Sequence, residues 1–425
     1  MTLDTNRITK SFLRRSTQAK GLPSGWWETH SGCKFDGLAM ASFKLKKVLT
    51  VALGPRLRAF LNFASPCTNH QIFATKAVSH QPLPMRLQKC FWVLLWALTI
   101  PYTLVCFVRR WVFCRLETYR SSLAIVSIGN IHLGGSGKTP LVLELSRHFG
   151  ARLPCIVMRG YRGKLSKQGA LVDPSQSDGP ELYGDEAFML AKKLSRPVYV
   201  GADRVASVKL IEQREQCGVV ILDDAFQNLR LRKTVNLVTI EVTKDPSDCF
   251  TLPLGSLREP LSMLRQADAI ILVGASEHTN ERQAWRAMLS SVTSTPPIFS
   301  VVRRSDGFWD GERPAVLQAD RNWVAFCGIA HPKRFSDDLR LHQNIQFGHA
   351  FPDHHRYRES DLDRLEQLRE SLGAAGFVTT EKDWFKVAPR LKVRTTPIFS
   401  FRIKYELPSA FTAWLDGRLD RPALE

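Results

Sequence analysis

Short apolar runs alternate with longer amphipathic stretches between residues 123 and 273. Each run spans four to six residues, and each connection is long enough to hold a crossover helix. The expected strands are Leu123–Ile128, Cys155–Met158, Pro197–Val200, Val219–Leu222, Asn236–Ile240 and Ala269–Val273. This alternation predicts an α/β fold built on a doubly wound, mostly parallel sheet.

A second, smaller α/β unit is expected further along the chain. Trp323–Gly328 and Phe377–Thr380 have the pattern of strands, and Glu359–Leu372 that of an amphipathic helix. Pro297–Ser300 and Pro397–Ser400 have the same four residues, so we expect connector strands near 297–304 and 397–404 that pair with each other. The predicted organisation is an N-terminal extension (1–84), an anchor helix (85–118), a core (119–296), a smaller domain (297–406) and a C-terminal tail (407–425).

A glycine-rich turn follows the first expected strand. Residues 129–139 read Gly-Asn-Ile-His-Leu-Gly-Gly-Ser-Gly-Lys-Thr, and a helical segment, Pro140–Phe149, comes next. Glycines let backbone N–H groups approach phosphate oxygens, Lys138 can reach the β- and γ-phosphates, and the Thr139 hydroxyl can ligate Mg²⁺. The pattern predicts a P-loop for a nucleoside triphosphate, although His132 stands where the usual motif has its first glycine.

Acidic residues follow other expected elements. Asp223 and Asp224 end a buried strand, where a carboxylate beside a phosphate loop holds Mg²⁺; a helix-capping acid pair is the alternative. Asp185 and Glu186 open an apolar helical stretch and could be caps, yet phosphoryl transfer to a hydroxyl also needs a base.

The longest apolar run is Cys90–Val108, nineteen residues without a charge. It is just long enough to cross a bilayer, and Pro101 would kink the helix without forbidding it. Nucleotide chemistry puts its C-terminal side in the cytoplasm, and a true span would then place the basic extension outside, against the positive-inside tendency. We expect a helix that either spans the membrane or lies in its interface; a buried helix of a soluble protein is the alternative.

Charge and cysteine content narrow the function classes. The net charge is +19, and residues 1–84 alone carry twelve Lys/Arg against three Asp/Glu. That excess suits an anionic membrane or substrate, and we find no nucleic-acid motif. The extension is either a targeting segment or the product of a mis-assigned start before Met85. Nine cysteines without a CxxC spacing argue against a disulfide framework or a zinc site.

Several charged turns lie at expected strand or helix ends, where loops line the crevice of such sheets. Arginines in the turn at Arg159–Lys164 suit a phosphorylated substrate. In Phe351–His355, a histidine paired with a carboxylate is easier to build than a metal site. Taken singly, these turns and those at Leu257–Pro260 and Thr380–Asp383 read as solvated loops.

Taken in order, these segments resemble the tetraacyldisaccharide 4′-kinase family, the lipid A 4′-kinases of Gram-negative bacteria, over residues 90–405. The residues that carry the resemblance are Gly129-Asn130 with Gly134–Pro140, Arg159-Gly160-Tyr161, Gly184-Asp185-Glu186, Asp203-Arg204-Val205, Asp223-Asp224 with Gln227, Leu257–Pro260, Phe351–His354 and Thr380–Asp383. The apolar helix is also similar to the family's N-terminal membrane helix, and the family's loop also lacks the first glycine. One departure is Asn228, where the family usually has histidine.

The resemblance implies an ATP-dependent kinase that phosphorylates the 4′-hydroxyl of a lipid-bearing glucosamine disaccharide 1-phosphate at the cytoplasmic face of the bacterial inner membrane, without an obligate protein partner. ATP would bind Gly134, Gly135, Ser136, Gly137, Lys138 and Thr139. Asp185 would be the general base, with His354 as its partner and Lys138 on the transferred phosphate. The implied Mg²⁺ residues are Thr139, Asp223, Asp224 and Glu259. The implied substrate residues are Asn130, Arg159, Gln227 and Arg258.

Two other functions fit parts of the pattern. A membrane-associated regulatory P-loop ATPase or GTPase would use the same loop, but the chain has no NKxD or DxxG motif, and Leu133 stands where one group of such ATPases has lysine. A non-enzymatic membrane-binding protein would need neither Lys138 nor Asp185.

Overall fold

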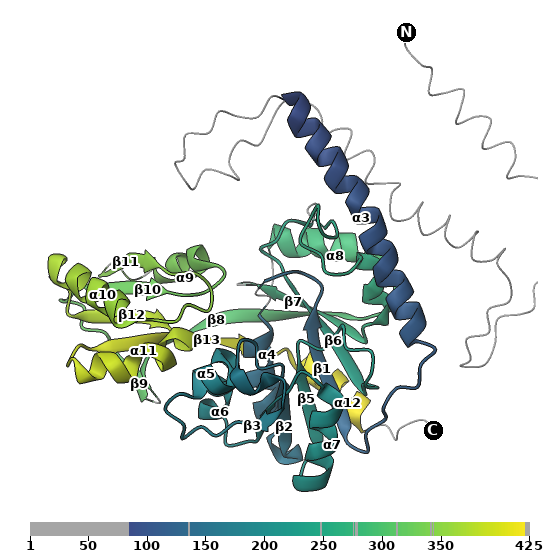
Figure 1. Ribbon diagram of the computed structural model, residues 1–425, viewed down its shortest axis with the longest axis horizontal. Coiled ribbons are helices and arrows are strands. Elements are labelled where there is room, and N and C mark those ends of the chain that lie inside the picture. The colour runs from purple at the N-terminus through teal and green to yellow at the C-terminus, as the bar shows by residue number, and fades with distance from the viewer. Residues whose placement is uncertain are drawn as a thin grey trace, which may run out of the picture. The chain divides into compact units, whose positions relative to one another are not determined.

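The structure, a computed structural model, describes residues 85–134, 137–246, 249–274, 276, 279–311, 313–340, 342 and 344–420, with side chains described from Val93 onward. The expected extension at 1–84 lies outside the described residues. The strands, all but β4 labelled in Figure 1, are β1 Ala124–Asn130, β2 Pro154–Met158, β3 Ala170–Leu171, β4 Val198–Val200, β5 Val219–Asp223, β6 Val235–Glu241, β7 Ala269–Gly274, β8 Ile298–Asp310, β9 Arg313–Ala315, β10 Trp323–Cys327, β11 Ile345–Ala350, β12 Gly376–Thr380 and β13 Ile398–Glu406.

The helices include each one expected from the apolar pattern. They are α3 Met85–Phe113, α4 Lys138–His148, α5 Gly179–Tyr183, α6 Asp185–Lys193, α7 Arg204–Arg214, α8 Asn280–Val292, α9 Pro332–Leu339, α10 Glu359–Ser371, α11 Glu381–Val393 and α12 Ser409–Leu419. Local capping fixes some starts: the Asp203 side chain accepts hydrogen bonds from the backbone of Val205 and Ala206 at the start of α7.

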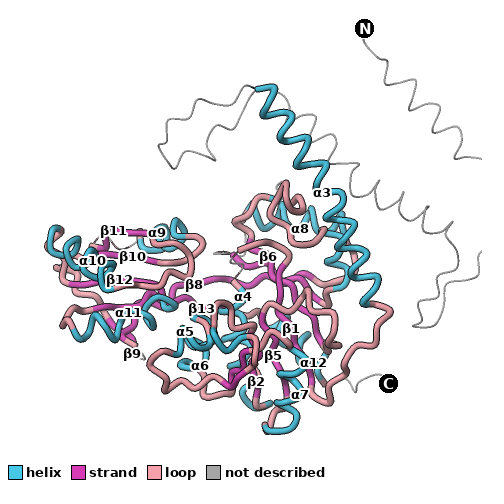
Figure 2. Tube along the Cα trace, in the orientation of Figure 1, coloured by secondary structure: helices cyan, strands magenta, loops and turns pink. Residues whose placement is uncertain are grey.

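The strands form one sheet, shown in magenta in Figure 2. Its order is β11-β10-β12-β13-β8-β7-β6-β1-β5-β2-β4-β3, with β9 paired to β8. Strand β1 lies between β5 and β6 and runs parallel to both. The chain therefore passes from one side of β1 to the other, and the carboxyl ends of β1 and β5 meet at the crevice where such sheets bind ligands. The predicted doubly wound, mostly parallel sheet is confirmed.

The two near-repeat segments pair as expected. Strands β8 and β13 are antiparallel, with Ser400 opposite Trp309 and Glu406 opposite Val302. The smaller unit, however, does not have a sheet of its own. Because β8 is thirteen residues long, it pairs with β7 of the core at one end and with β9 at the other, so a single sheet runs through both parts.

Helices cover both faces of the core sheet. Alternate residues of β1 face opposite sides: Ile128 packs in the cluster that includes α4, α6 and α12, whereas Ile125 packs with α7. The expected C-terminal tail therefore contains a packed helix, since Phe411 and Leu415 of α12 are fully buried. Their burial ties the end of the described chain to the core.

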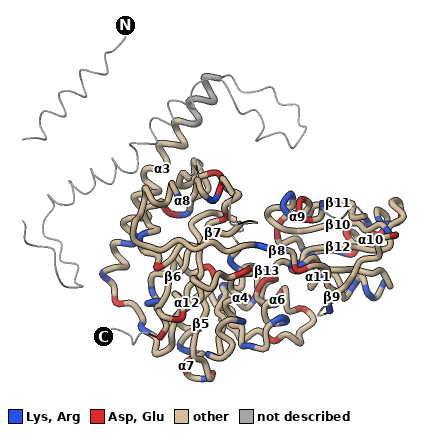
Figure 3. Tube along the Cα trace, turned by 180° about the vertical axis from the view of Figure 1, so that it is seen from behind, with Lys and Arg blue, Asp and Glu red and all other residues tan. Residues whose placement is uncertain are grey.

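Helix α3 is, among the described helices, the one long and apolar enough to cross a membrane, over Val93–Phe113. Its described part carries no charged side chain before Arg109 (Figure 3). The helix is not free of the core, because the Tyr102 hydroxyl donates to the Arg258 carbonyl at 2.8 Å and the Thr103 and Thr251 hydroxyls lie 2.9 Å apart. Its C-terminal half is therefore docked on the connection between β6 and β7.

Candidate functional site

The glycine-rich loop joins the end of β1 to the start of α4. Gly134 and Gly137 have φ values of 85° and 69°, the left-handed region that glycine adopts without strain. A Cβ on Gly137 would lie 2.0 Å from the Tyr405 hydroxyl of β13, so no side chain fits there. Gly135 and Ser136 lie outside the described residues. The described residues Gly134 and Gly137 thus have backbone conformations that suit a phosphate-binding loop, and the helix that follows begins at Lys138.

His132 occupies the place of the missing glycine. It is buried and stands edge-on to Trp285, with 5.8 Å between ring centroids. Burial, aided by Lys244, lowers the pKa of His132 to about 4. The ring is therefore neutral at physiological pH and acts as a packing group beneath the loop, which explains how the chain forms the cradle without that glycine.

The acid pair lies beside the loop at the end of β5. The Lys138 ammonium is 3.3 Å from Asp224, and the Arg258 guanidinium is 3.1 Å from the same carboxylate. Burial alone would raise the pKa of Asp224, but Lys138 and Arg258 together hold it below its usual value. The carboxylate therefore stays charged and holds both cations near the phosphate cradle.

Asp223 differs from its neighbour. Its Oδ1 has no hydrogen-bond partner among the described residues, and burial raises the pKa of this carboxyl to about 7. A buried oxygen without a partner fits a missing cation. The Thr139 hydroxyl donates to Glu186 at 2.7 Å, so a third polar group lies on α4 near the acids.

Within the described residues, no three His, Cys, Asp or Glu side chains form a complete metal site. This agrees with Mg²⁺ chemistry, because that ion usually takes one or two carboxylates and completes its shell with phosphate oxygens and water. Asp223 and Thr139 therefore fit an ion that arrives with a nucleotide.

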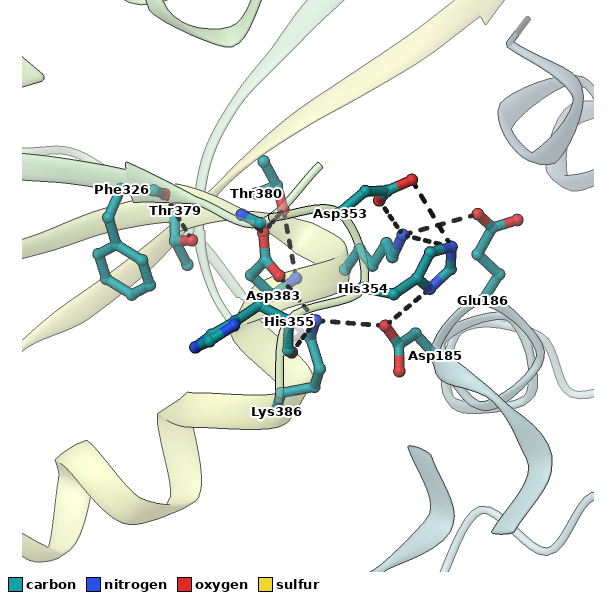
Figure 4. Close-up of polar contacts among 12 residues, drawn as sticks. Asp185, Glu186, Phe326, Asp353, His354, His355, Thr379, Thr380, Asp383 and Lys386 are labelled. Atoms are coloured by element: carbon teal, nitrogen blue, oxygen red, sulfur yellow. Dashed lines mark hydrogen bonds and ion pairs between the residues drawn. The ribbon is translucent and has the colours of Figure 1, made fainter. Parts of the chain in front are cut away.

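Asp185 begins α6 and meets His354 from the smaller unit (Figure 4). Its Oδ2 lies 3.2 Å from His354 Nδ1 and 3.2 Å from the Lys386 ammonium. Burial alone would raise the pKa of Asp185, but His354, Lys386 and Lys382 together lower it. The structure thus brings together the two residues that the family resemblance pairs, and keeps the carboxylate ionised.

Two lysines of α11 neutralise this part of the site. Lys386 also contacts Asp383 at 2.8 Å, and this fully buried carboxylate accepts a hydrogen bond from the Gly328 backbone. Lys382 lies 3.2 Å from His354 Nε2 and 3.2 Å from Asp353. The His354 ring thus bridges Lys382 at Nε2 and Asp185 at Nδ1.

Glu259 has a different position from the one expected. Both its oxygens contact the Arg110 guanidinium of α3, at 3.1 and 2.5 Å, and the side chain is buried. Arg110 also lies over the Phe226 ring, with its Cζ 4.6 Å from the centroid. Because α3 already supplies the cation, we remove Glu259 from the metal residues and assign it to docking of the helix.

The expected substrate residues do not all lie in the crevice. Asn130 is fully buried, and its amide donates to the His132 carbonyl within the loop. The Gln227 amide donates to the Asn130 carbonyl at 2.8 Å, so both residues shape the loop from behind. Arg159 is exposed in the turn after β2, and Arg258 is the member of this set that contacts the acid pair.

Sequence reasoning did not assign roles to Glu186, Lys382, Lys386 or Arg110. Lys386 had one usable signal, because it follows Asp383 by three residues, a spacing that puts two side chains on one face wherever the chain is helical. The contact of Lys386 with Asp185 joins residues 201 positions apart, and no local pattern encodes it.

Comparison with known proteins identifies the family of this chain. The profile of the family described as Tetraacyldisaccharide-1-P 4′-kinase matches residues 91–420. A tetraacyldisaccharide 4′-kinase from Syntrophobacter fumaroxidans is 38% identical over 280 residues, which cover 63% of this chain and 73% of that protein. One from Syntrophus aciditrophicus is 34% identical over 305 residues, covering 67% and 80%.

A solved structure has a similar fold. It is an "apo" form of the Aquifex aeolicus protein of this family in complex with ATP, with a TM-score of 0.61 and 24% sequence identity. The similarity covers 77% of this chain and 99% of that one.

Proposed function

The chain belongs to the tetraacyldisaccharide-1-P 4′-kinase family, and we propose that Asp185, His354 and Lys138 carry out its phosphate transfer. The enzyme transfers the γ-phosphate of ATP to the 4′-hydroxyl of a tetraacylated glucosamine disaccharide 1-phosphate in lipid A biosynthesis. Family membership removes the regulatory ATPase alternative. The contact of Asp185 with His354, beside the glycine-rich loop, carries the proposed residue roles.

ATP would bind at the glycine loop, with its phosphates toward the start of α4. Lys138 would contact the β- and γ-phosphates, and it already faces the Asp224 carboxylate at 3.3 Å. Thr139 and Asp223 would hold Mg²⁺, which when bound neutralises charge on the phosphate oxygens. Arg258 would add positive charge beside the transferred group.

Asp185 would take the proton of the acceptor hydroxyl. In the described part of the chain its two contacts fall on Oδ2, which leaves Oδ1 for that proton. The transition state of phosphoryl transfer is loose, so a carboxylate of low pKa suffices as a base. His354 and Lys386 would orient Asp185 and keep it charged until the proton arrives.

The helix α3 would hold the enzyme at the cytoplasmic face of the inner membrane. Tyr102 through Arg110 contact the core, so the apolar part of the helix left for lipid is Cys90–Pro101. Twelve helical residues are about 18 Å long, against a hydrocarbon thickness of about 30 Å. We therefore favour a helix that lies in the interface, with exposed residues such as Leu98 and Ile100 in the acyl layer.

The core (119–296) and the smaller domain (297–406) would close on each other around the substrates. Asp185 belongs to the first and His354 to the second, so their contact depends on the relative placement of these parts. Lys193 of α6 and Glu381 of α11 form a second contact between them at 2.7 Å.

The decisive test is the reaction itself. Membranes containing the protein are incubated with ATP, Mg²⁺ and tetraacyldisaccharide 1-phosphate, and the bisphosphate product is measured. We expect product with the natural chain, none after chelation of Mg²⁺, and almost none with Lys138→Ala. The proposal is wrong if the natural chain forms no product and Lys138→Ala matches it in ATP binding and turnover.

A further inference from the structure

A cleft of about 170 Å³ lies beside the C-terminal end of α3. Its walls come from α3, from the start of α7 and from the turn after β5. The polar residues that line it are Arg109, Asp203, Arg204, Gln227, Asn228 and Arg230. None of them belongs to the glycine loop, so the nucleotide does not account for the cleft.

Three arginines make the cleft basic. Arg230 is 63% exposed, and its nearest carboxylate, Asp203, is 3.5 Å away and already caps α7. Arg109 donates to the Gln227 carbonyl at 2.6 Å and keeps 43% of its side chain exposed. The guanidinium is a planar group with five donors, so each of these two retains N–H groups for an anion.

The third arginine connects the cleft to the reaction site. Arg204 is buried, and its Nη2 donates to the backbone carbonyl of Asp223 at 3.2 Å. Its Nε has no hydrogen-bond partner among the described residues, which leaves a buried donor unsatisfied.

An apolar hollow of about 190 Å³ adjoins the cleft and shares Phe113 and Arg230 with it. Leu116, Tyr119 and Val205 form its other large walls. An arginine-lined cleft next to an apolar hollow, both at the end of the anchor helix, matches a molecule with a phosphate next to an acyl chain.

We propose that this cleft binds a lipid-borne phosphate, with the adjoining hollow receiving the start of an acyl chain. This inference rests on the proposed function, because it needs α3 at the membrane surface. The phosphate is not the one being transferred, since neither Lys138 nor Thr139 lines the cleft. It belongs either to the acceptor, as its 1-phosphate, or to the headgroup of a neighbouring anionic phospholipid.

Arg230 is the residue to change, because it is exposed and far from the fold's core. Arg230→Ser removes the charge and Arg230→Lys keeps it. Arg232→Ser is the matched control, since Arg232 is an exposed arginine two positions along that does not line the cleft.

The first arm compares KM for the acceptor with and without its 1-phosphate. The second compares binding to phosphatidylcholine vesicles with and without phosphatidylglycerol. Each arm gives a ratio: the KM ratio of the two acceptors, or the ratio of binding to the two kinds of vesicle. We expect Arg230→Ser to reduce one of these ratios about fivefold to tenfold, the equivalent of one charged contact, and Arg230→Lys to restore most of it.

Loss of discrimination in the first arm identifies the acceptor's phosphate, and loss in the second identifies a headgroup. If Arg230→Ser matches Arg232→Ser in both arms, the inference is wrong. A natural chain that forms no product would instead overturn the proposed function, and the vesicle arm would still test the cleft.

Discussion

The two walls of the active site hold their charges in different ways. On the core wall, the buried Asp223 has one oxygen without a partner in the described chain, and Asp224 draws Lys138 and Arg258 toward the phosphate loop. On the opposite wall, Lys386 is already held between Asp383 and Asp185. The core wall therefore keeps a buried carboxylate oxygen that can bind a cation, whereas on the other wall Lys386 is already fixed between two carboxylates.

The core wall should therefore serve mainly to bind the nucleotide, and the opposite wall mainly to position the base. On the core wall, the protonation of Asp223 and the stability of its surroundings should change when a nucleotide and its cation bind. The contacts of Lys386 and His354 with Asp185, which exist without a ligand, should hold this carboxylate in one position and keep it ionised. Substitutions on the two walls should therefore give different signatures.

The largest effect is expected on the core wall. Lys138→Met removes the ammonium that faces the transferred phosphate, and we expect kcat to fall by about 10⁴. The measurement is product formation at saturating substrates. Lys164→Met is the control, because Lys164 pairs with Glu181 on the surface and should leave kcat unchanged. A Lys138→Met enzyme within tenfold of the natural one would contradict this role.

The next effect tests Asp185, the residue of the core that contacts His354 and Lys386 of the opposite wall. Asp185→Asn keeps the size of the side chain and removes the base, so kcat should fall about 10²- to 10³-fold. The dissociation constant for ATP should stay within about threefold, because Asp185 positions the acceptor rather than the nucleotide. Turnover and ATP binding are measured separately. Normal turnover with a large loss of ATP affinity would show that Asp185 serves nucleotide binding and is not the base.

A smaller effect is a shift in the pH profile. Asp185 has a lowered pKa and acts as a carboxylate, so activity is kept above that pKa and lost as the pH falls through it. Lys386→Met removes a cation 3.2 Å away, raises the pKa and should move the acid limb of kcat/KM up by about one pH unit.

Two controls accompany this profile. Lys392→Met, in the same helix, breaks an exposed pair with Asp310 and should leave the limb in place. A melting curve checks that Lys386→Met is folded, since it leaves the buried Asp383 without its cation. If Lys386→Met is folded and the acid limb of its kcat/KM profile does not move, Lys386 does not act on Asp185.

The smallest effect concerns stability. Burial raises the pKa of Asp223 to about 7, so the folded protein binds this proton more tightly than the unfolded chain and loses stability as the pH rises from about 4 to 7. Asp223→Asn removes that penalty. We expect the ligand-free variant to melt about 5 °C higher than the natural chain at pH 8, with little gain at pH 4. An equal gain at both pH values would show that ionisation is not the cause.

The fold was predictable where its signals are local. Buried strands appear as continuous apolar runs, and the adjacency of β1 and β5 follows from the order of a nucleotide-binding sheet, so the acid pair beside Lys138 was expected. The Asp185–His354 contact, across 169 positions, came from the family resemblance and not from spacing.

Other residues could not be placed because tertiary packing decides them. Glu259 reads as one more acid near a nucleotide site, and its pairing with Arg110 depends on where α3 docks. Tyr405 against Gly137 likewise depends on how β13 joins β8, which the near-repeat indicated only as a pairing.

The docking of α3 has a practical consequence for inhibitor discovery. Tyr102 holds the backbone of Arg258, Arg110 holds Glu259 beside it, and the Arg258 side chain reaches Asp224. A shortened chain that begins after α3 would be easier to purify, but it would present a loosened Arg258 to every compound tested. Screens run on such a chain would rank molecules against a pocket that the enzyme with α3 in place does not have.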